Sequence, residues 1–342
     1  MTEIRYPEHG SPARSTDIYE WQGHRGEVLD TVQGSDGLEY RVIRCQGCIL
    51  THVAPIPSDD WLEDYYRSRF YQSSKPDYVS RYEEDRGWWQ LWHQVTINQA
   101  LMLLRGSDAH ADEQSWERTY HCLDIGTGPG IFLDVAKRSG WSTYGLEINK
   151  ELQQRALGHE HLVYAKSLQA FLTNDFEPGS PGFDFVHAYE VLEHVPQPDV
   201  FLEQCYEMLK PGGVIAITVP NDYSTLQMAA CKQFNLPRWW VAPPEHLNYF
   251  SPKTLQLLIR RSGFTIRELR GTFPLETFLF MGRPYVGNDE IGRVCHHERV
   301  RYEMNMAKAG LMDWLLDQYR HNVEHSYSYA VGREIVAIAQ KE

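Results

Sequence analysis

The sequence contains no run of about 18 consecutive apolar residues, so it offers no candidate for a membrane-spanning helix. Its N-terminus is polar and shows no secretory leader pattern. Cysteine is scarce, with 6 among 342 residues, so we expect no disulfide framework and predict a cytoplasmic protein in a reducing compartment. Positive charge is also limited, because 33 Lys and Arg face 46 Asp and Glu for a net charge of −13. We therefore expect neither a membrane nor an extended nucleic-acid surface as partner.

Apolar residues, by contrast, are plentiful, since the sequence is 42% hydrophobic and 13% aromatic, enough for a sizeable core. A predicted buried strand ends near Asp124. Glycines follow at alternate positions, Gly126, Gly128 and Gly130, before a predicted apolar helix over 130–139. Glycine allows the backbone to turn sharply or to approach a ligand closely, because it has no Cβ. The N–H groups that open the helix would point at whatever lies over this loop.

A second acidic residue follows the next predicted strand. Glu147 comes directly after an extended stretch, 142–146, and lies 21 residues after Gly126. In a doubly wound α/β sheet, an acidic residue at this place reaches the hydroxyls of a ribose. The loop pattern D-x-G-x-G-x-G differs from the dinucleotide pattern G-x-G-x-x-G, and nothing in it favours a pyrophosphate. The alternative is a plain strand–loop–helix unit with an incidental surface glutamate.

Strands and helices alternate through the middle of the sequence, which is typical of a parallel sheet covered by helices on both faces. The expected strands lie near 120–125, 142–147, 161–165, 183–188 and 213–219, and the expected helices near 130–139, 149–156, 168–173 and 199–209. A sixth strand is expected over 263–270 and a last one over 334–339. The sequence therefore predicts an α/β fold.

Two further motifs carry a family resemblance. Residues 190–195 read EVLEHV after the fourth expected strand, and residues 209–213 read LKPGG before the fifth. With these motifs the chain resembles the class I S-adenosylmethionine-dependent methyltransferases over about residues 116–270. The resemblance implies a Rossmann-like, seven-stranded, mostly parallel sheet whose seventh strand is antiparallel. Since strands six and seven follow each other closely in that family, we interpret residues 271–332 as a helical insertion that caps the substrate side or makes a dimer contact.

The N-terminal part differs from this domain. Cys45 and Cys48 form a C-x-x-C knuckle, which is half of a zinc ribbon. The stretch resembles the small module that precedes the catalytic domain in bacterial sugar C-methyltransferases, although its first C-x-x-C pair is missing. His24 stands about where a ligand would be sought, and the Cys-His-His run at 295–297 could supply ligands only from far along the chain. We favour a degenerate knuckle with cysteines packed as small apolar groups and predict no metal site, with zinc at Cys45 and Cys48 as the alternative.

The predicted organisation has four parts. They are an N-terminal arm with a degenerate zinc-ribbon-like module over 1–58, an aromatic helical lid and linker over 59–115, a methyltransferase domain over 116–270 and 333–342, and the insertion over 271–332.

The resemblance also assigns residues to the cofactor, S-adenosylmethionine. The residues assigned to the methionine portion are Asp124, Gly126, Thr127, Gly128 and Gly130, and the residue assigned to the ribose is Glu147. The adenine is assigned to Ile148 and to Ser167 and Leu168, which follow Lys166. The sulfonium is assigned to Tyr189 and Glu190. Aromatic faces favour a sulfonium cation. We therefore assign Tyr82, with Tyr71 and Arg81, to the lid over the methionine end. The alternative for Ser167 and Leu168 is a helix start with Ser167 as its cap.

Methyl transfer from a sulfonium is an in-line displacement, which requires alignment and exclusion of water but neither a metal nor an oxyanion hole. A base helps only where the nucleophile has a high pKa. The candidate catalytic residues are His194, in the EVLEHV motif, and the group of Glu245, His246 and Tyr249. The candidate bases among them are His194 and His246, which forms an acid–histidine pair with Glu245. The alternative for His246 is a structural role in a loop that precedes the next helix. We expect His187, on the fourth strand, to be structural.

We consider four functions. The first is O- or C-methylation of a sugar or nucleotide-sugar, which the N-terminal module and the aromatic residues favour. The alternative is O- or N-methylation of a quinone, phenol or other secondary metabolite, since EVLEHV also occurs in quinone-pathway enzymes. A non-catalytic cofactor-binding scaffold is disfavoured by the intact loop, Glu147 and His246. RNA methylation is disfavoured because residues 188–191 read AYEV rather than an NPPY-type motif. The expected partner is a small molecule, with a homodimer possible.

Overall fold

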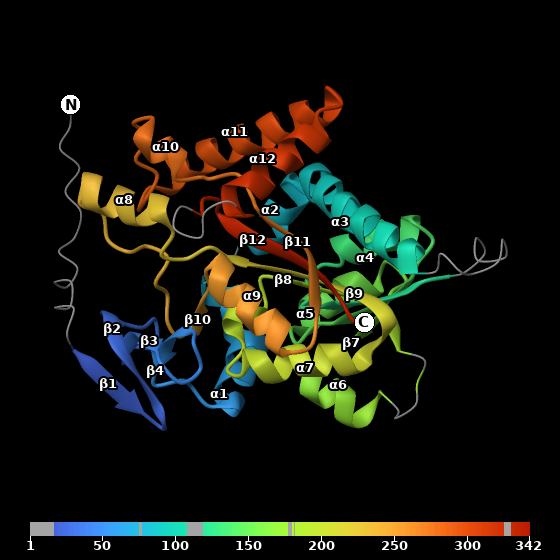
Figure 1. The fold of residues 1–342 in the computed structure, drawn as a ribbon, viewed down its shortest axis with the longest axis horizontal. Helices are drawn as coiled ribbons and strands as arrows, with labels where there is room; N and C mark the ends of the chain where they lie inside the picture. Colours follow the sequence, from blue (N-terminus) through green and yellow to red (C-terminus); the bar gives the residue numbers. More distant parts are fainter. Residues whose placement is uncertain (1–16, 75–76, 108–118, 177–179, 181, 325–329) are drawn as a thin grey trace.

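The computed structural model describes residues 17–74, 77–107, 119–176, 180, 182–324 and 330–342 (Figure 1). At its centre lies a seven-stranded sheet with the order β11-β12-β9-β8-β5-β6-β7. Its strands are β5 (His121–Ile125), β6 (Ser142–Leu146), β7 (Leu162–Tyr164), β8 (Phe183–Tyr189), β9 (Leu209–Pro220), β11 (Thr265–Gly271) and β12 (Glu334–Gln340). The first five strands pair in parallel, whereas β12 is antiparallel to both of its neighbours. This arrangement confirms the predicted fold class.

Strand β12 lies between β9 and β11, and every one of its residues is buried. Its register places Ile335 opposite Val219 and Ala337 opposite both Ile217 and Leu269. A strand covered on both faces reads as a continuous apolar run rather than as an alternation of apolar and polar residues. This is why the run over 334–339 is recognisable as a core strand.

Helices cover both faces of the central sheet (Figure 1). One face packs against α3 (Arg86–Ser107), α4 (Ile131–Arg138) and α5 (Lys150–Leu157), and the other against α6 (Leu168–Asn174), α7 (Pro198–Met208) and α9 (Pro252–Arg261). Helix α4 buries Ile131, Phe132, Val135 and Ala136, as its apolar spacing predicts. The sheet core on this side includes Phe185 and Val214, which are fully buried.

A second, antiparallel sheet is built from the N-terminal residues. Its strands β1 (Ile18–Trp21), β2 (His24–Gln33), β3 (Glu39–Cys45) and β4 (Thr51–Ala54) run in order, and a fifth strand, β10 (Asn248–Tyr249), completes it from far along the chain. The register places Asn248 opposite His52 and Tyr249 opposite Thr51. The sequence predicts short strands in the N-terminal part but does not predict β10. The N-terminal sheet is therefore joined directly to the main domain.

The segment between the two sheets is helical, as predicted. It contains α1 (Asp59–Asp64), a π-helix η1 (Tyr65–Ser74), α2 (Tyr78–Glu84) and α3. The side chain of Tyr71, which the sequence assigns to the lid, lies outside the described residues. Among the described residues, none of the helices has the length and apolar character needed to cross a bilayer.

The insertion is also helical, with α10 (Thr277–Phe280), α11 (Asp289–Lys308) and α12 (Met312–Glu324). On α11, His296 Nε2 lies 2.7 Å from Asp85 Oδ2, and His297 Nε2 lies 3.3 Å from Glu84 Oε1. These contacts fix α11 over α2 and the start of α3, as the top of Figure 1 shows. The idea that the Cys-His-His run at 295–297 supplies ligands to the N-terminal cysteines is therefore wrong, because these histidines pair with acidic residues of the helical segment.

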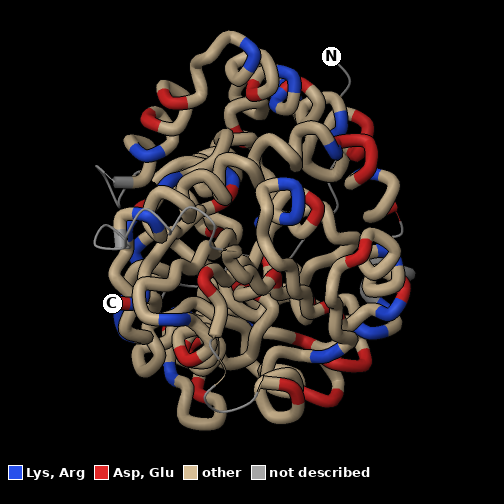
Figure 2. The backbone as a smooth tube through the Cα atoms, turned by 90° about the vertical axis from the view of Figure 1, so that its right-hand side faces the viewer, with Lys and Arg blue, Asp and Glu red and all other residues tan. Residues whose placement is uncertain are grey.

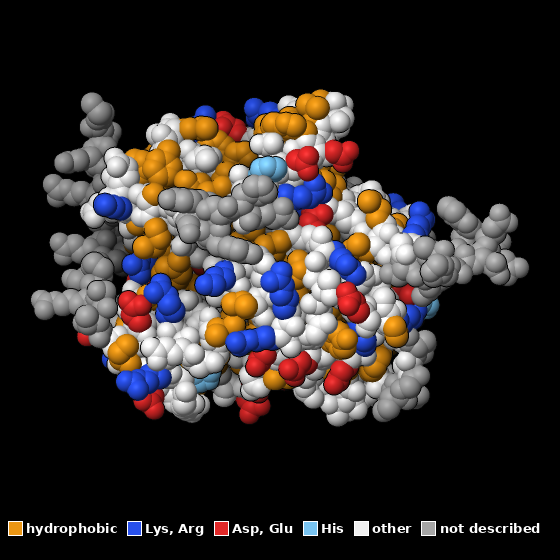
Figure 3. Space-filling model, in the orientation of Figure 1, with side chains coloured by type: hydrophobic (Ala, Val, Ile, Leu, Met, Phe, Trp, Pro, Cys, Tyr) orange, Lys and Arg blue, Asp and Glu red, His pale blue; other side chains and the backbone are white. Residues whose placement is uncertain are grey.

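The surface carries mixed charge. Figure 2 shows Lys and Arg interspersed with Asp and Glu over the face in view. Apolar side chains gather over α8 (Thr225–Phe234) and α10 in Figure 3, where Phe234 and Phe280 are 38% and 46% exposed with ring centroids 5.4 Å apart. The homodimer remains a prediction.

Candidate active site

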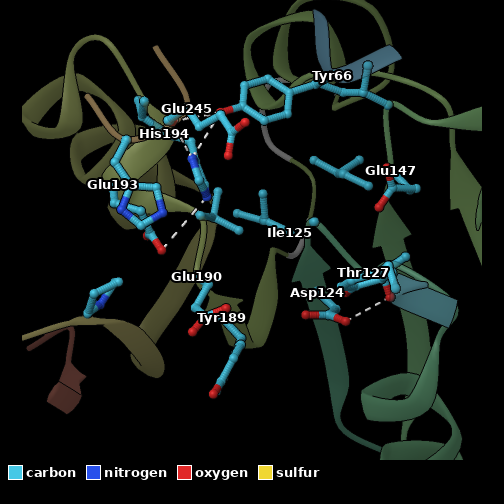
Figure 4. Close-up of a pocket in the computed structure, with 18 of the residues that line it drawn as sticks. Tyr66, Asp124, Ile125, Thr127, Glu147, Tyr189, Glu190, Glu193, His194 and Glu245 are labelled. Atoms are coloured by element: carbon cyan, nitrogen blue, oxygen red, sulfur yellow. Dashed lines mark hydrogen bonds and ion pairs between the residues drawn. The ribbon is translucent and has the colours of Figure 1, made fainter. Parts of the chain in front are cut away.

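A cleft of about 1330 Å³ opens at the carboxyl ends of β5, β6 and β8. Ligands bind at this edge in open α/β sheets, because the loops there leave a crevice between the strand ends. Figure 4 shows Asp124, Thr127 and Glu147 on one side of the cleft and Glu193, His194 and Glu245 on the other. The helical segment contributes Tyr66 and Tyr82, and residues of the insertion, including Arg293, close a further side.

The glycine loop after β5 is shaped by close contacts. The N–H groups of Gly126 and Thr127 both donate to the Leu146 carbonyl, at 2.8 and 3.0 Å, which ties the loop to the end of β6. Gly126 has φ +72°, and a Cβ there would lie 2.8 Å from Val191 Cγ2. Gly130 has φ +89° and a Cβ would lie 3.0 Å from Ala156 Cβ. Both positions therefore require glycine, as the sequence predicts.

Two buried carboxylates lie beside this loop. Glu147 accepts hydrogen bonds from the backbone N–H of Gly128 at 2.9 Å and of Asn149 at 2.8 Å. Burial raises the pKa of Glu147 to about 7. Asp124 accepts from the Thr127 hydroxyl at 2.7 Å and contacts His187 Nδ1 at 2.7 Å. His187 therefore orients Asp124 at the end of the strand.

A stripe of side chains from α2 and α3 faces the loop. Tyr78, Tyr82, Asp85, Trp89 and His93 all line the cleft, and their numbers follow helical spacing. The Tyr82 and Trp89 rings stack with centroids 4.4 Å apart, and Trp89 meets Tyr189 edge to face at 5.2 Å. The Tyr78 hydroxyl lies 3.1 Å from the position of a Cβ on Gly128. The sequence assigns only Tyr82, with its neighbour Arg81, to this wall, although the spacing of the other residues carries the same signal.

Most residues assigned from the sequence line the cleft. The cleft wall includes Asp124, Gly126, Thr127, Glu147, Ile148, Lys166, Ser167, Leu168, Tyr189, Glu190, His194, Glu245, His246, Tyr82 and Arg81. Ser167 also caps α6, because its hydroxyl accepts from the Ala170 N–H at 3.3 Å. Gly128 and Gly130 lie behind this wall, where they shape the loop and the start of α4.

The side of the cleft opposite Glu147 holds the acid–base groups. His194 Nδ1 lies 2.6 Å from the main-chain carbonyl of Glu245 and 2.9 Å from the Tyr66 hydroxyl, and that hydroxyl donates to the same carbonyl at 2.9 Å. His194 Nε2 lies 3.8 Å from Glu193 Oε1, and the His246 ring centre is 5.0 Å from that of His194. The ligand atoms of Glu193, His194 and His246 lie within 4.8 Å of one another, so this group could also hold a metal ion.

Glu193 is the residue of this group that the sequence does not assign a role. It is 1% exposed, and burial raises its pKa well above the usual range for a carboxyl group. The preceding Glu190 has φ +51°, in the left-handed region that only glycine adopts easily. Non-glycine residues in this conformation gather at functional sites, where the surrounding structure holds them in place.

Tyr249 does not line the cleft, contrary to its assignment as a catalytic residue. It is 2% exposed, and its hydroxyl donates to the His246 carbonyl at 3.2 Å. Tyr249 itself pairs with Thr51 of β4 in the N-terminal sheet. Next to it, the Asn248 side chain donates to the Val195 carbonyl at 2.7 Å and so holds the short 3-10 helix η3 (Leu192–His194). Tyr249 and Asn248 therefore position the site.

Comparison with known proteins decides the family. A sequence profile described as a methyltransferase domain matches residues 82–269. The chain belongs to this methyltransferase family. The cofactor of the family is S-adenosylmethionine.

Curated relatives match part of the chain. The mitochondrial ubiquinone biosynthesis O-methyltransferase of Mus musculus is 29% identical over 157 residues, 44% of this chain and 42% of that protein. The ubiquinone biosynthesis O-methyltransferase of Shewanella sp. is 26% identical over 169 residues, 48% of this chain and 72% of that protein. The chain thus matches less than half the length of the mouse relative. A solved S-adenosylmethionine-dependent methyltransferase from Archaeoglobus fulgidus is 19% identical, covers 77% of this chain and 99% of its own, and has a TM-score of 0.47.

The residues beside the glycine loop fit this cofactor. The buried Glu147 carboxylate can accept hydrogen bonds from both ribose hydroxyls, and its Oε2 already accepts from the Gly128 N–H of the loop. Glu190 and the aromatic rings of Tyr82, Trp89 and Tyr189 suit a cation such as a sulfonium. The residues on this side of the cleft therefore suit the cofactor of the family.

Cofactor affinity should depend on pH through Glu147. Burial raises the pKa of Glu147 from 4.5 to about 7. The contribution of Glu147 to the free energy of unfolding of the cofactor-free protein is therefore complete below about pH 4.5 and is lost as the pH rises through about 7. The ribose hydroxyls need the ionised form, so binding should strengthen by up to about tenfold per pH unit up to pH 7. Calorimetric titration with S-adenosylmethionine at several pH values measures this slope.

The matched variants are Glu147→Gln and Asp222→Asn. Burial raises the pKa of Asp222 to about 7 as well, but Asp222 does not line the cleft. We expect Glu147→Gln to bind S-adenosylmethionine weakly, with an affinity that does not change with pH. Asp222→Asn should keep the pH dependence of the wild-type affinity. A slope that survives in Glu147→Gln would contradict the ribose assignment.

Proposed function

We propose that the chain is an S-adenosylmethionine-dependent methyltransferase that methylates an oxygen of a small molecule, with a phenolic hydroxyl of the quinone-precursor type as the acceptor. The observation that carries this proposal is the group of His194, Glu193 and Glu245 opposite the cofactor side of the same cleft. A hydroxyl acceptor must lose a proton during transfer, and a histidine at this place can take it.

The hydrogen bonds of His194 support its role as the base. Its Nδ1 lies 2.6 Å from the Glu245 carbonyl, which can only accept, so Nδ1 carries the proton and donates. The lone pair is then on Nε2, the atom on the side of Glu193. Bound S-adenosylmethionine supplies an electrophilic methyl group. As the new O–C bond forms, His194 Nε2 accepts the hydroxyl proton, while the electron pair of the broken C–S bond goes to sulfur.

Glu245 and His246 have supporting roles in this proposal. The Glu245 carboxylate accepts from the Tyr65 hydroxyl at 2.8 Å, so it anchors the π-helix that carries Tyr66. His246 packs beside His194 and lines the cleft. Ser251, rather than His246, caps α9, because its hydroxyl accepts from the Thr254 N–H at 3.3 Å.

The comparisons support a phenolic or quinone acceptor better than the sugar acceptor that the sequence favours. The curated relatives named above are O-methyltransferases of ubiquinone biosynthesis. The cleft wall is also rich in aromatic side chains, which pack well against an aromatic acceptor.

Incubation with deuterium-labelled S-adenosylmethionine tests the acceptor. One pool contains phenols and quinone precursors, and a second contains nucleotide-sugars, including keto-sugars. We expect mass spectrometry to find labelled methyl on a phenolic oxygen, and no label with the Glu147→Ala variant. Label on sugars alone would overturn the acceptor class, whereas label in neither pool would contradict a small-molecule acceptor of either kind.

A further inference from the structure

Four side chains with metal-binding atoms converge in the N-terminal sheet, away from the cleft. They are His24, Cys45, Cys48 and His52, and their ligand atoms all lie within 4.8 Å of one another. His24 Nδ1 is 3.7 Å from Cys45 Sγ. The rings of His24 and His52 meet nearly at right angles, with centroids 4.8 Å apart. The structure thus brings both histidines to the cysteines, and of the two the sequence points only to His24 as a candidate ligand.

The backbone is built to hold this group together. Strand β2 begins at His24 and β3 ends at Cys45, and the register places Gly26 opposite Cys45. A Cβ on Gly26 would lie 2.2 Å from the Arg44 carbonyl oxygen, so only glycine permits this approach of the strands. The turn that carries Cys48 is closed by a hydrogen bond from the Cys45 N–H to the Leu50 carbonyl at 2.9 Å.

His52 supplies an independent sign of a missing ligand. It is 2% exposed, and its Nδ1 lies 2.8 Å from the Val53 carbonyl, so Nδ1–H donates and Nε2 carries the lone pair. His52 Nε2 is buried and has no hydrogen-bond partner among the described residues. Buried polar atoms in folded proteins nearly always have a partner. A backbone carbonyl bonded to the far nitrogen is also the usual support of a metal-binding histidine.

We propose that His24, Cys45, Cys48 and His52 bind one zinc ion as a tetrahedral Cys2His2 site. Zinc–sulfur bonds of about 2.3 Å and zinc–nitrogen bonds of about 2.0 Å give a tetrahedron with edges of roughly 3.3–3.8 Å, which the 3.7 Å contact of His24 with Cys45 matches. Thiolate and imidazole ligands select zinc over the hard cations. Four protein ligands leave no open position, so the metal is structural.

The proposed zinc site is linked to the cleft through the backbone. The Val53 N–H donates to the Leu247 carbonyl at 2.9 Å, and the Leu247 N–H donates to the Glu193 carbonyl at 2.8 Å. His52 also pairs with Asn248, which holds η3. Zinc would therefore fix the strand that positions Glu193 and its neighbour His194. This consequence rests on the proposed function, whereas metal binding itself does not.

Elemental analysis of the purified full chain tests the site. We expect about one zinc per chain after reconstitution under reducing conditions, with the same content in Cys231→Ser. Cys231 is a half-buried cysteine outside the group, like Cys48 in exposure. The Cys48→Ser variant should hold less than about one fifth as much zinc. Wild-type protein without stoichiometric zinc, or with a Cys45–Cys48 disulfide in its place, would overturn the proposal.

Cobalt substitution in the wild-type chain tests the site even if the Cys48→Ser variant does not fold. Co²⁺ alone, added to metal-free protein, should give thiolate charge-transfer bands and the strong visible bands of a tetrahedral centre. In His52→Cys, which keeps four ligands, the metal should remain and the thiolate bands should grow. Unchanged bands in His52→Cys would remove His52 from the site. Zinc retention in a variant that is inactive in methyl transfer would separate failure of the proposed function from failure of the metal site.

Discussion

The His194→Ala variant should have a kcat lower by roughly 100- to 10,000-fold, with a Kd for S-adenosylmethionine within about threefold of wild type, which is the effect of losing a general base. His194 lies across the cleft from Asp124 and Glu147 (Figure 4). Its Nδ1 is held by the Glu245 carbonyl, so in the proposed reaction its Nε2 accepts the proton. Alanine removes that acceptor and leaves the glycine loop and Glu147 in place.

Single-turnover kinetics with labelled S-adenosylmethionine and calorimetric titration measure the two quantities separately. Added imidazole should restore part of the rate in His194→Ala, because it can occupy the vacated space and accept the proton. Tyr66→Phe is the matched control, since it removes one hydroxyl that contacts His194 Nδ1 but keeps the histidine. If His194→Ala lost cofactor affinity and rate to the same extent, His194 would be a structural residue.

Replacement of Glu303 by alanine should lower the free energy of unfolding by about 3–5 kcal/mol, because it leaves three largely buried donors without their acceptor, at a cost of roughly 1–3 kcal/mol each. Glu303 lies on α11 and is 1% exposed. Its carboxylate accepts from the indole N–H groups of Trp88 at 2.5 Å and Trp92 at 3.0 Å, and from the Tyr319 hydroxyl at 2.6 Å. One side chain thus joins α3, α11 and α12.

Urea unfolding of Glu303→Ala, followed by fluorescence and by circular dichroism, measures this loss. The control is Glu298→Ala on the same helix, where a half-exposed ion pair with Arg283 should contribute less than about 1 kcal/mol. Glu303→Gln should fall between the two, since its amide oxygen still accepts. A stability change of Glu303→Ala no larger than that of Glu298→Ala would show that the insertion packs without this network.

The elements of the central sheet could be predicted because their signals are local. The apolar run of β12 and the stripe on α4 both reflect burial of neighbouring residues within one element. Strand β10 has no such signal, since it consists of only two residues, Asn248 and Tyr249. Its existence depends on where β4 lies in space. The sequence therefore predicts the main domain and the short N-terminal strands but not their connection.

The same distinction applies to the site. Asp124 and Glu147 stand at strand ends, so their positions follow from the α/β pattern. Tyr249 could not be placed, because whether its ring faces the cleft or the N-terminal sheet depends on its pairing with Thr51. His52 likewise has no sequence motif that links it to Cys45, and only the register of β3 and β4 brings them together. A site whose residues come from separate strands can therefore be recognised only once the fold is known.

The position of β12 also has a consequence for synthesis of the protein on the ribosome. Residues 334–340 form the strand that separates β9 from β11, yet they are translated after both of them. Until this segment emerges from the exit tunnel, β9 and β11 of the nascent chain lack the strand that pairs with both, and their unpaired edges can associate with other chains. Closure of the sheet therefore follows synthesis of all its other strands, and holdase chaperones that protect apolar edges should matter most in that interval.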